Sequence, residues 1–337
     1  MGCVLSRIAV PKSALRRRPP YRRFADGRPF LSAAYDVQQA RPVQMGGSKR
    51  DRHRGWFPSD PSPTPTRWTT GLMNNGDDSL LNLPHWLRNR LPRERPARLR
   101  RYLREPLGFV FRRDLPKLAM IYGSDKWGVH WYATHYARHF SHLRLKRITL
   151  LEIGIGGYEE PKAGGNSLRM WRRYFRNAKI VGLDCFDKSP HAEKRIRIYR
   201  GDQSDEELLR RIVAEVGRPD IVIDDGSHIN RHVIRSFEVL FPLLADDGLY
   251  VVEDTQTAYW PDCGGSSDDM LHAPTSMCLL KSLVDGLNHE EFIKPGYIPS
   301  YCDQHITGLH FYHNLVFIQK GRNDEGSNRV VHNREPA

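Results

Sequence analysis

Two carboxylates and an imidazole follow directly on an apolar run in the segment DIVIDDGSHINRHV, which spans residues 220–233. The run predicts a buried strand, and Asp224, Asp225 and His228 stand at its end. Like charges crowded at a strand end are costly unless a positive group lies beside them. The segment therefore indicates a bound metal ion, a cationic cofactor, or both.

Four other predicted strands also end in acidic residues, so that every one of five strand ends carries at least one carboxylate. Ligands of parallel α/β sheets bind outside the carboxyl ends of the strands, and we therefore expect these side chains to surround one site. In chain order the five ends carry Glu152 with Gly154, Gly156 and Gly157; Asp184; Asp202 and Gln203; Asp224, Asp225 and His228; and Glu253 and Asp254.

Three of these acids suit a nucleoside that carries an amino acid and no phosphate. Glu152 would repel phosphate and attract an ammonium, Asp184 is placed to accept hydrogen bonds from ribose hydroxyls, and Asp202 can accept one from an adenine amino group. The GIGG loop allows close backbone approach but lacks the third glycine of the dinucleotide fingerprint. These features predict S-adenosylmethionine (SAM). The alternative, that the acids only cap helices, fits Asp184 or Asp202 singly but not the whole row.

The remaining carboxylates, Asp225, Glu253 and Asp254, exceed what SAM can use. Hard oxygen ligands at this density suit Mg²⁺, whereas zinc would require cysteine or more histidine. The alternative is that EDTQ (253–256) is a strand end with an ordinary salt bridge. His228, three residues after Asp225, can accept a proton near neutral pH, although a lone histidine is usually structural.

Alternating strands and helices from about residue 116 onward are predicted to position these side chains. This order is typical of an α/β fold, a doubly wound parallel sheet with helices on both faces. The patterns predict strands at 147–153, 179–184, 195–202, 219–225 and 248–254, helices at 167–175 (capped by Asn166 or Ser167), 204–217, 230–244 and 274–288, and a final antiparallel pair at 308–313 and 314–321.

The first third of the chain differs in composition from the rest. Residues 1–115 hold 24 Lys and Arg against 9 Asp and Glu, and 13 of the 23 prolines, whereas the remainder is nearly neutral. The sequence predicts a basic, mostly disordered arm (1–75), a basic helical linker (76–115), a globular domain (116–322) and a disordered tail (323–337). The positive charge of residues 1–115 could bind nucleic acid or an anionic membrane. A solvated tail is the simpler interpretation, because no nucleic-acid-binding motif accompanies this charge.

The segment MGCVLS (1–6) matches the myristoylation pattern, with Cys3 as a palmitoylation candidate, but this pattern is short and common by chance. The five cysteines form no CxxC pair and no secretory signal precedes them, so reduced thiols are expected. No apolar run reaches the roughly 18 residues of a membrane-spanning helix. We therefore expect a cytoplasmic protein without a membrane span.

Seven motifs, in order along the chain, resemble one known family. They cover roughly residues 116–322 and are similar to the macrolide-type sugar O-methyltransferases, which act on deoxysugars of macrolide and related polyketide antibiotics. The motifs are YGSDKWGVHWYATHY (122–136), LLEIGIGGY (150–158), GLDCFDKS (182–189), GDQSD (201–205), IDDGSHIN (223–230), VVEDTQTAYWP (251–261) and HFYHNLVFIQKG (310–321).

The resemblance implies a Rossmann-like, class I SAM-dependent methyltransferase that requires SAM and Mg²⁺ and acts on a glycosylated polyketide. It makes Asp225, Glu253 and Asp254 the metal ligands and His228 the proton acceptor, and it lets YGSDKWG close over the site. Family members oligomerise with help from an ordered N-terminal region, which the arm here does not match. The residues implied to bind SAM are Glu152, Gly154, Gly156, Gly157, Tyr158, Ser167, Asp184, Asp202 and Gln203, with Asp225 alongside.

Three other functions remain open. A Mg²⁺-dependent methyltransferase of a catechol or other phenolic hydroxyl would use nearly the same site. An RNA-acting methyltransferase would use the basic arm, although nucleic acid is the less favoured partner. A non-catalytic partner subunit would keep the fold, but the intact acids and His228 argue against it. The segment TAYWPDCGGSSDDM (257–270) is expected to form part of an acceptor lid.

Overall fold

The computed structural model describes residues 96–329, with side chains from residue 103 onward. The arm predicted for residues 1–75, including MGCVLS, and the first half of the predicted linker (76–95) lie outside the described residues. Helix α2 (Pro96–Val110) begins at a proline, a position where the missing N–H has no helical partner to lose, and it continues past Pro106. No helix in the described part of the chain is long and apolar enough to cross a membrane.

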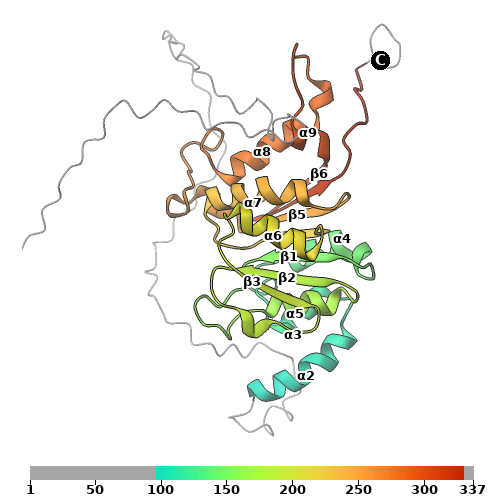
Figure 1. Ribbon diagram of the computed structural model, residues 1–337, viewed down its shortest axis with the longest axis vertical. Coiled ribbons are helices and arrows are strands. Elements are labelled where there is room, and N and C mark those ends of the chain that lie inside the picture. The colour runs from blue at the N-terminus through green and yellow to red at the C-terminus, as the bar shows by residue number, and fades with distance from the viewer. Residues whose placement is uncertain (1–95, 330–337) are drawn as a thin grey trace, which may run out of the picture. The chain divides into compact units, whose positions relative to one another are not determined.

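The central element is a seven-stranded sheet with the order β3-β2-β1-β4-β5-β7-β6 (Figure 1). Strands β1 to β5 pair in parallel, whereas β7 is antiparallel to both β5 and β6. The predicted doubly wound α/β fold and the predicted final antiparallel pair are confirmed. The strands are β1 (Thr149–Ile153), β2 (Lys179–Asp184), β3 (Ile196–Arg200), β4 (Ile221–Asp224), β5 (Leu249–Glu253), β6 (Ile306–Tyr312) and β7 (Leu315–Lys320).

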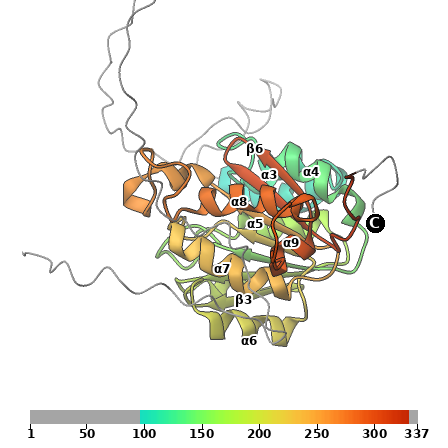
Figure 2. The ribbon, with the colours of Figure 1, turned by 90° about the horizontal axis from the view of Figure 1, so that it is seen from above.

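Successive side chains of a strand point to opposite faces, so both faces of this sheet carry apolar side chains. Helices cover each face. In β1, Leu151 and Ile153 join an apolar core with α6, α7 and α8, whereas Leu150 joins a second core with α3, α4 and α5. Figure 2 shows α6 and α7 on the side away from α3 and α4. The helices are α3 (Leu115–Tyr122), α4 (Ala133–Phe140), α5 (Asn166–Tyr174), α6 (Glu206–Val216), α7 (Asn230–Leu243), α8 (Ser276–Leu287) and α9 (Tyr301–His305).

The start of α5 differs from the prediction. Neither Asn166 nor Ser167 caps the helix, because the residue before it is Gly165 in the left-handed conformation, with a φ of 68°. The two expected caps are engaged elsewhere. The Asn166 amide donates to the Gly123 carbonyl, and the Ser167 hydroxyl donates to Glu152, both at 2.9 Å. The predicted cap was wrong because tertiary partners recruited both side chains.

The predicted tail boundary at residue 323 falls within the described chain. The Asn323 amide donates to the carbonyls of Leu287, at 3.0 Å, and Asp303, at 2.7 Å. The Ser327 hydroxyl donates to a carboxylate oxygen of Glu291 at 2.9 Å. Residues 330–337, the rest of the predicted tail, lie outside the described part.

The register of the sheet brings its central strand ends together. Asp224, the last residue of β4, pairs with Ile153 of β1 and with Val252 of β5. Carried one residue further, this register places Asp225 beside Glu253. The acidic residues that follow neighbouring strands therefore meet at one edge of the sheet, as expected for parallel strands.

Candidate active site at the strand ends

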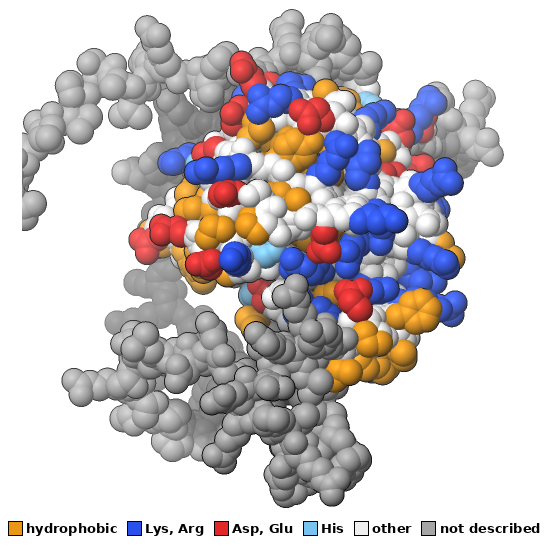
Figure 3. All heavy atoms as spheres, turned by 60° about the horizontal axis from the view of Figure 1, so that its bottom comes forward, with side chains coloured by type: hydrophobic (Ala, Val, Ile, Leu, Met, Phe, Trp, Pro, Cys, Tyr) orange, Lys and Arg blue, Asp and Glu red, His pale blue; other side chains and the backbone are white. Residues whose placement is uncertain are grey.

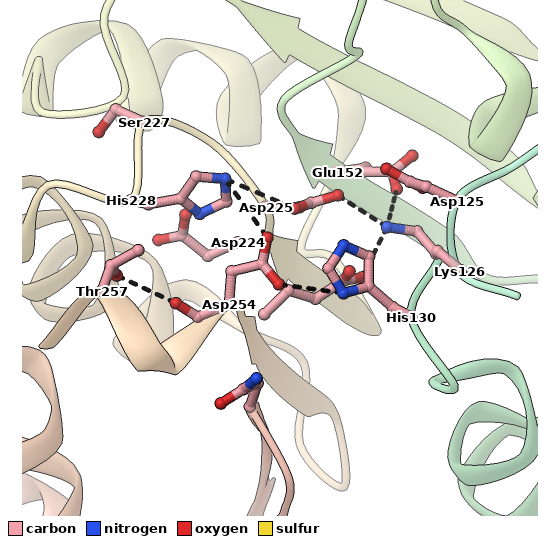
Figure 4. A network of polar contacts seen from close by, with 12 residues as sticks. Asp125, Lys126, His130, Glu152, Asp224, Asp225, Ser227, His228, Asp254 and Thr257 are labelled. Atoms are coloured by element: carbon pink, nitrogen blue, oxygen red, sulfur yellow. Dashed lines mark hydrogen bonds and ion pairs between the residues drawn. The ribbon is translucent and has the colours of Figure 1, made fainter. Parts of the chain in front are cut away.

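An outer acidic cluster, formed by Asp225, His228 and Asp254, lies at the carboxyl ends of β4 and β5 (Figure 4). The Nε2 of His228 is 3.9 Å from Oδ1 of Asp225 and 3.8 Å from Oδ2 of Asp254. In the described part of the chain, these three side chains form the group whose ligand atoms approach closely enough to hold a metal ion, all within 4.8 Å of one another. Each side chain is partly exposed, which leaves the cluster open to a ligand.

Two residues of the outer cluster have unusual backbone conformations. His228 has a φ of 56° and Asp254 a φ of 51°, both in the left-handed region that residues other than glycine rarely adopt. Strained conformations of this kind concentrate at functional sites, where the surrounding structure holds them in place. Here the strain accompanies two side chains that leave neighbouring strands and face one another.

Behind Asp225, an inner cluster of buried charges surrounds Lys126. The Nζ of Lys126 is 2.8 Å from Oδ2 of Asp225, 2.6 Å from Oε1 of Glu253 and 3.4 Å from Oε1 of Glu152. The Tyr136 hydroxyl also donates to Oε1 of Glu253, at 2.5 Å. Lys126, Glu152 and Glu253 are at most 3% exposed. Glu253, predicted as a metal ligand, thus has one oxygen engaged by Lys126 and Tyr136.

The charges of the inner cluster perturb one another. Burial and the neighbouring Asp225 raise the pKa of Glu253, with Lys126 opposing. Burial raises the pKa of Glu152 to about 6, again against the pull of Lys126. Burial alone would lower the pKa of Lys126, but Asp225, Glu253 and Glu152 outweigh it and raise that pKa well above the usual value. Lys126 is therefore a charged counter-ion at neutral pH.

The segment that carries Lys126 also contacts the outer cluster. The Tyr132 hydroxyl donates to Oδ1 of Asp254 at 2.7 Å, and Nδ1 of His130 lies 3.7 Å from the same oxygen. The segment YGSDKWG (122–128) was expected to close over the site, but the individual roles of Lys126, Tyr132 and Tyr136 were missed. Charge balance is the signal that could have identified the lysine, because a buried row of acids requires a buried cation.

Glu152, predicted to meet an ammonium group of a ligand, has partners within the protein on both oxygens. Its Oε2 accepts a hydrogen bond from the Ser167 hydroxyl at 2.9 Å, and its Oε1 accepts one from the Trp171 indole at 3.2 Å. The side chain is fully buried. Glu152 and Ser167, both predicted to bind SAM, therefore join β1 to α5 beneath the glycine loop.

Asp184, predicted to hold ribose hydroxyls, accepts two backbone hydrogen bonds at the end of β2. Its Oδ2 accepts from the N–H of Ile155, and its Oδ1 accepts from the N–H of Phe186, both at 2.9 Å. The first of these bonds reaches the loop that follows β1. Asp184 therefore fixes the position of the glycine loop against the second strand.

The glycine loop after β1 packs closely on the end of β4. Gly154 has a φ of 88°, and a Cβ at this position would lie 1.9 Å from the Asp225 carbonyl oxygen. Only glycine fits there, because any side chain would collide with backbone. Gly156, Gly157 and Tyr158 continue the loop with positive φ values. The Tyr158 side chain is 84% exposed.

Two residues predicted to bind SAM follow β3, and one of them is buried while the other is exposed. The Gln203 amide donates to Oδ1 of Asp224 at 3.0 Å, and its oxygen accepts from the N–H of Ser227 at 2.6 Å. Burial raises the pKa of Asp224 to about 6. Asp202 is exposed, and its Oδ1 accepts from the N–H and hydroxyl of Ser204. Gln203 therefore supports the turn after β4, while Asp202 faces solvent.

The donor set of the outer cluster fits a hard divalent cation. It offers a carboxylate oxygen from Asp225, another from Asp254 and open positions for water, a combination that Mg²⁺ prefers. His228 lies between the two carboxylates. An imidazole in this position can take a proton from a hydroxyl held at the same place. The geometry therefore suits metal-assisted chemistry on an alcohol.

The chain is similar to named sugar methyltransferases. It is 52% identical over 215 residues to mycinamicin VI 2''-O-methyltransferase of Micromonospora griseorubida and to demethylmacrocin O-methyltransferase of Streptomyces fradiae, in each case over 63% of this chain and 54% of the relative. It is 49% identical to 8-demethyl-8-alpha-L-rhamnosyl tetracenomycin-C 2'-O-methyltransferase of Streptomyces olivaceus, over 63% of this chain and 56% of that protein. No family model matches the chain.

A solved methyltransferase has the same fold. The enzyme MycE from the mycinamycin biosynthetic pathway, in complex with Mg and SAH, matches with a TM-score of 0.62 and 52% identity, over 63% of this chain and 55% of that chain. The resemblance inferred from the seven motifs is therefore confirmed, together with the methyltransferase-type fold. The chain spans about half the length of the curated relatives it matches.

Proposed function

We propose that this protein is a SAM- and Mg²⁺-dependent O-methyltransferase that methylates a hydroxyl of a deoxysugar, such as a rhamnose-type sugar, on a glycosylated polyketide. The observation that carries the proposal is the outer cluster, in which Asp225, His228 and Asp254 converge at two adjacent strand ends. The fold shared with a methyltransferase solved with Mg and SAH supports the two cofactors. The names of the relatives support the sugar acceptor.

Asp225 and Asp254 would hold Mg²⁺ through the oxygens that face His228, while the ligand role of Glu253 stays a prediction from the resemblance. When bound, the ion would act as a Lewis acid that stabilises negative charge on the acceptor oxygen. Lys126 and Tyr136 hold Glu253, and Tyr132 holds Asp254, so that the carboxylates are oriented before any ligand arrives. Such preorganisation lowers the barrier, because no reorientation is needed during the reaction.

His228 would accept the proton of the acceptor hydroxyl. As the oxygen gains the methyl group, the bond between sulfur and methyl breaks and the proton moves to Nε2. Asp225 and Asp254 lie within 4 Å of this nitrogen, next to the positive charge that would form there. Tyr158 and Asp202, the exposed members of the predicted SAM set, would contact the cofactor. Glu152, Ser167, Asp184 and Gln203 would support its loops from the interior.

The test is mass spectrometry of the purified full-length chain with SAM, MgCl₂ and a panel of rhamnosyl and allosyl polyketides. We expect one methyl group to be added to a glycoside and S-adenosylhomocysteine to be released, with loss of turnover in EDTA. Catechol and RNA serve as competing acceptors. Methylation of catechol alone would support the phenolic alternative, methylation of RNA alone would support the nucleic-acid alternative, and full turnover in EDTA would contradict the metal.

A further inference from the structure

The carboxylate of Asp225 divides the acidic site into two halves. Its Oδ2 faces inward to Lys126 at 2.8 Å, and its Oδ1 faces outward to His228 at 3.9 Å. The inner half contains Lys126 with Glu152 and Glu253 and is closed to solvent. The outer half is partly exposed and contains the atoms that fit a divalent cation. The two halves therefore share one carboxylate but hold different positive charges.

The inner half is neutralised by the protein itself. An ammonium group has three donors, and three carboxylates lie within 3.4 Å of the Lys126 Nζ. Buried carboxylates without a counter-charge are strongly destabilising, and Tyr136 adds only a neutral hydrogen bond to Glu253. Within the described part of the chain, no other lysine or arginine makes an ion pair with these three acids.

We propose that Lys126 is the resident cation of the inner half and a positioning residue for the metal site. Its ammonium neutralises the buried acids in the absence of a metal, keeps Oδ1 of Asp225 turned outward, and confines a divalent cation to the outer half. The proposal rests on the Mg²⁺ site of the proposed function. It assigns to Lys126 a further consequence, because a fixed positive charge next to the site weakens the binding of the divalent ion.

Removal of the ammonium should therefore strengthen metal binding. Lys126→Met keeps an apolar chain of similar length but leaves three buried acids without their cation. A divalent ion near these acids would no longer be repelled by the lysine and would meet one more unit of net negative charge. We expect the affinity for Mn²⁺, used as a spectroscopic substitute for Mg²⁺, to increase at least about tenfold.

Lys320→Met is the matched control. Lys320 is as buried as Lys126, at 1% exposure, but its Nζ donates to the backbone carbonyls of Phe241, Pro242 and Leu244 instead of to acids. Both substitutions remove a buried ammonium and both should destabilise the fold. Only Lys126→Met should change the binding of a metal, so a general loss of stability cannot produce the expected result.

The experiment measures Mn²⁺ binding by electron paramagnetic resonance, and thermal unfolding in EDTA and in excess Mg²⁺, for the full-length wild type and both variants. We expect tighter Mn²⁺ binding and a larger Mg²⁺-induced rise in Tm for Lys126→Met than for the wild type or Lys320→Met. Unchanged or weaker Mn²⁺ binding by Lys126→Met, or equal changes in both variants, would overturn the proposal.

A second variant covers the case in which Lys126→Met does not fold in EDTA. Adding Glu253→Gln removes one of the stranded carboxylates, so the double variant should recover part of the lost stability; no recovery would count against the proposal. These readouts need no acceptor, so a protein that binds Mn²⁺ as expected but methylates no glycoside would refute only the proposed function. A wild type that binds no Mn²⁺ would overturn the inference on Lys126.

Discussion

Two buried lysines lie at opposite edges of the parallel sheet, one at the carboxyl ends of its strands and one at the amino ends, and they have different partners. Lys126 lies at the carboxyl ends of the parallel strands, among three carboxylates. Lys320 ends the antiparallel strand β7 at the opposite edge, where its N–H donates to the Gly248 carbonyl just before β5. Its Nζ donates to three carbonyls at the end of α7, at 2.9 to 3.2 Å.

The two pKa values shift in opposite directions. Burial lowers the pKa of Lys320 to about 8, and the positive charge of Arg218 acts in the same direction. The pKa of Lys126 rises, because full negative charges outweigh burial. A lysine that meets helix carbonyls satisfies the backbone and contributes to the fold. A lysine that meets three acids neutralises their negative charge, and a cluster of mutually perturbed acids marks a candidate functional site.

Exposed basic residues gather at the amino ends of the parallel strands. The segments at the amino ends of β1, β2 and β3 carry exposed basic residues, namely Lys146, Arg147, Arg176, Lys179 and Arg197. Figure 3 shows a face of the molecule on which lysine and arginine side chains are prominent. The nearly neutral composition of residues 116–337 therefore conceals a basic edge at the amino ends of the strands, opposite the outer acidic cluster at their carboxyl ends. Substitutions at the two edges should have very different consequences.

The largest effect is expected at the outer cluster. His228→Ala removes the proposed proton acceptor and should reduce kcat about 10²–10⁴-fold, while SAM binding measured by calorimetry stays unchanged. His232→Ala is the control, because His232 is partly exposed and bonds to the Ser227 hydroxyl at 3.0 Å, outside the outer cluster. Wild-type turnover in His228→Ala would remove this histidine from the mechanism.

A smaller effect is expected for the hydroxyl that binds Glu253. Tyr136→Phe deletes a buried hydrogen bond to a carboxylate, and it should lower the free energy of unfolding by about 2 to 3 kcal/mol. Tyr199→Phe deletes an exposed hydrogen bond to Glu215 and should change the free energy by less than about 1 kcal/mol. Urea unfolding of both variants measures the difference, and equal effects would contradict a special role for the buried pair.

The inner cluster also predicts a dependence on pH. The pKa of Glu152 is about 6 in the folded protein against 4.5 for the ordinary group. A carboxyl whose pKa is raised by folding loses stability as the pH rises through that range. The Glu152→Gln variant has no carboxyl group to ionise at this position. The free energy of unfolding of this variant, relative to that of the wild type, should therefore increase by about 2 kcal/mol between pH 4 and pH 7. A difference that does not change with pH would show that Glu152 has an unshifted pKa.

The smallest effect is expected at the basic edge. Lys146→Ala changes an exposed residue before β1 and should alter the free energy of unfolding by no more than about 0.5 kcal/mol. Turnover and Mn²⁺ affinity should stay at wild-type values. A loss of turnover in this variant would show that the two edges are coupled and would weaken the contrast between them.

Most of the sheet could be predicted because its signals are local. Apolar runs of strand length alternate with amphipathic segments, and every predicted strand of the parallel sheet is found within a few residues of its expected bounds. The helices α3, α4 and α9 were not predicted. They hold 8, 8 and 5 residues, and helices this short are stabilised mainly by tertiary packing rather than by intrinsic propensity.

The sequence by itself determined which residue types stand at each strand end, because the positions of the strands along the chain follow from local patterns of apolar residues. Only the tertiary structure decided which carboxylate oxygens face inward. Lys126 is 99 residues from Asp225 and 127 residues from Glu253 along the chain, so no local pattern relates them. The choice of partner depends on the packing of the segment before α4 against the strand ends, where burial makes one ammonium the counter-charge of three acids.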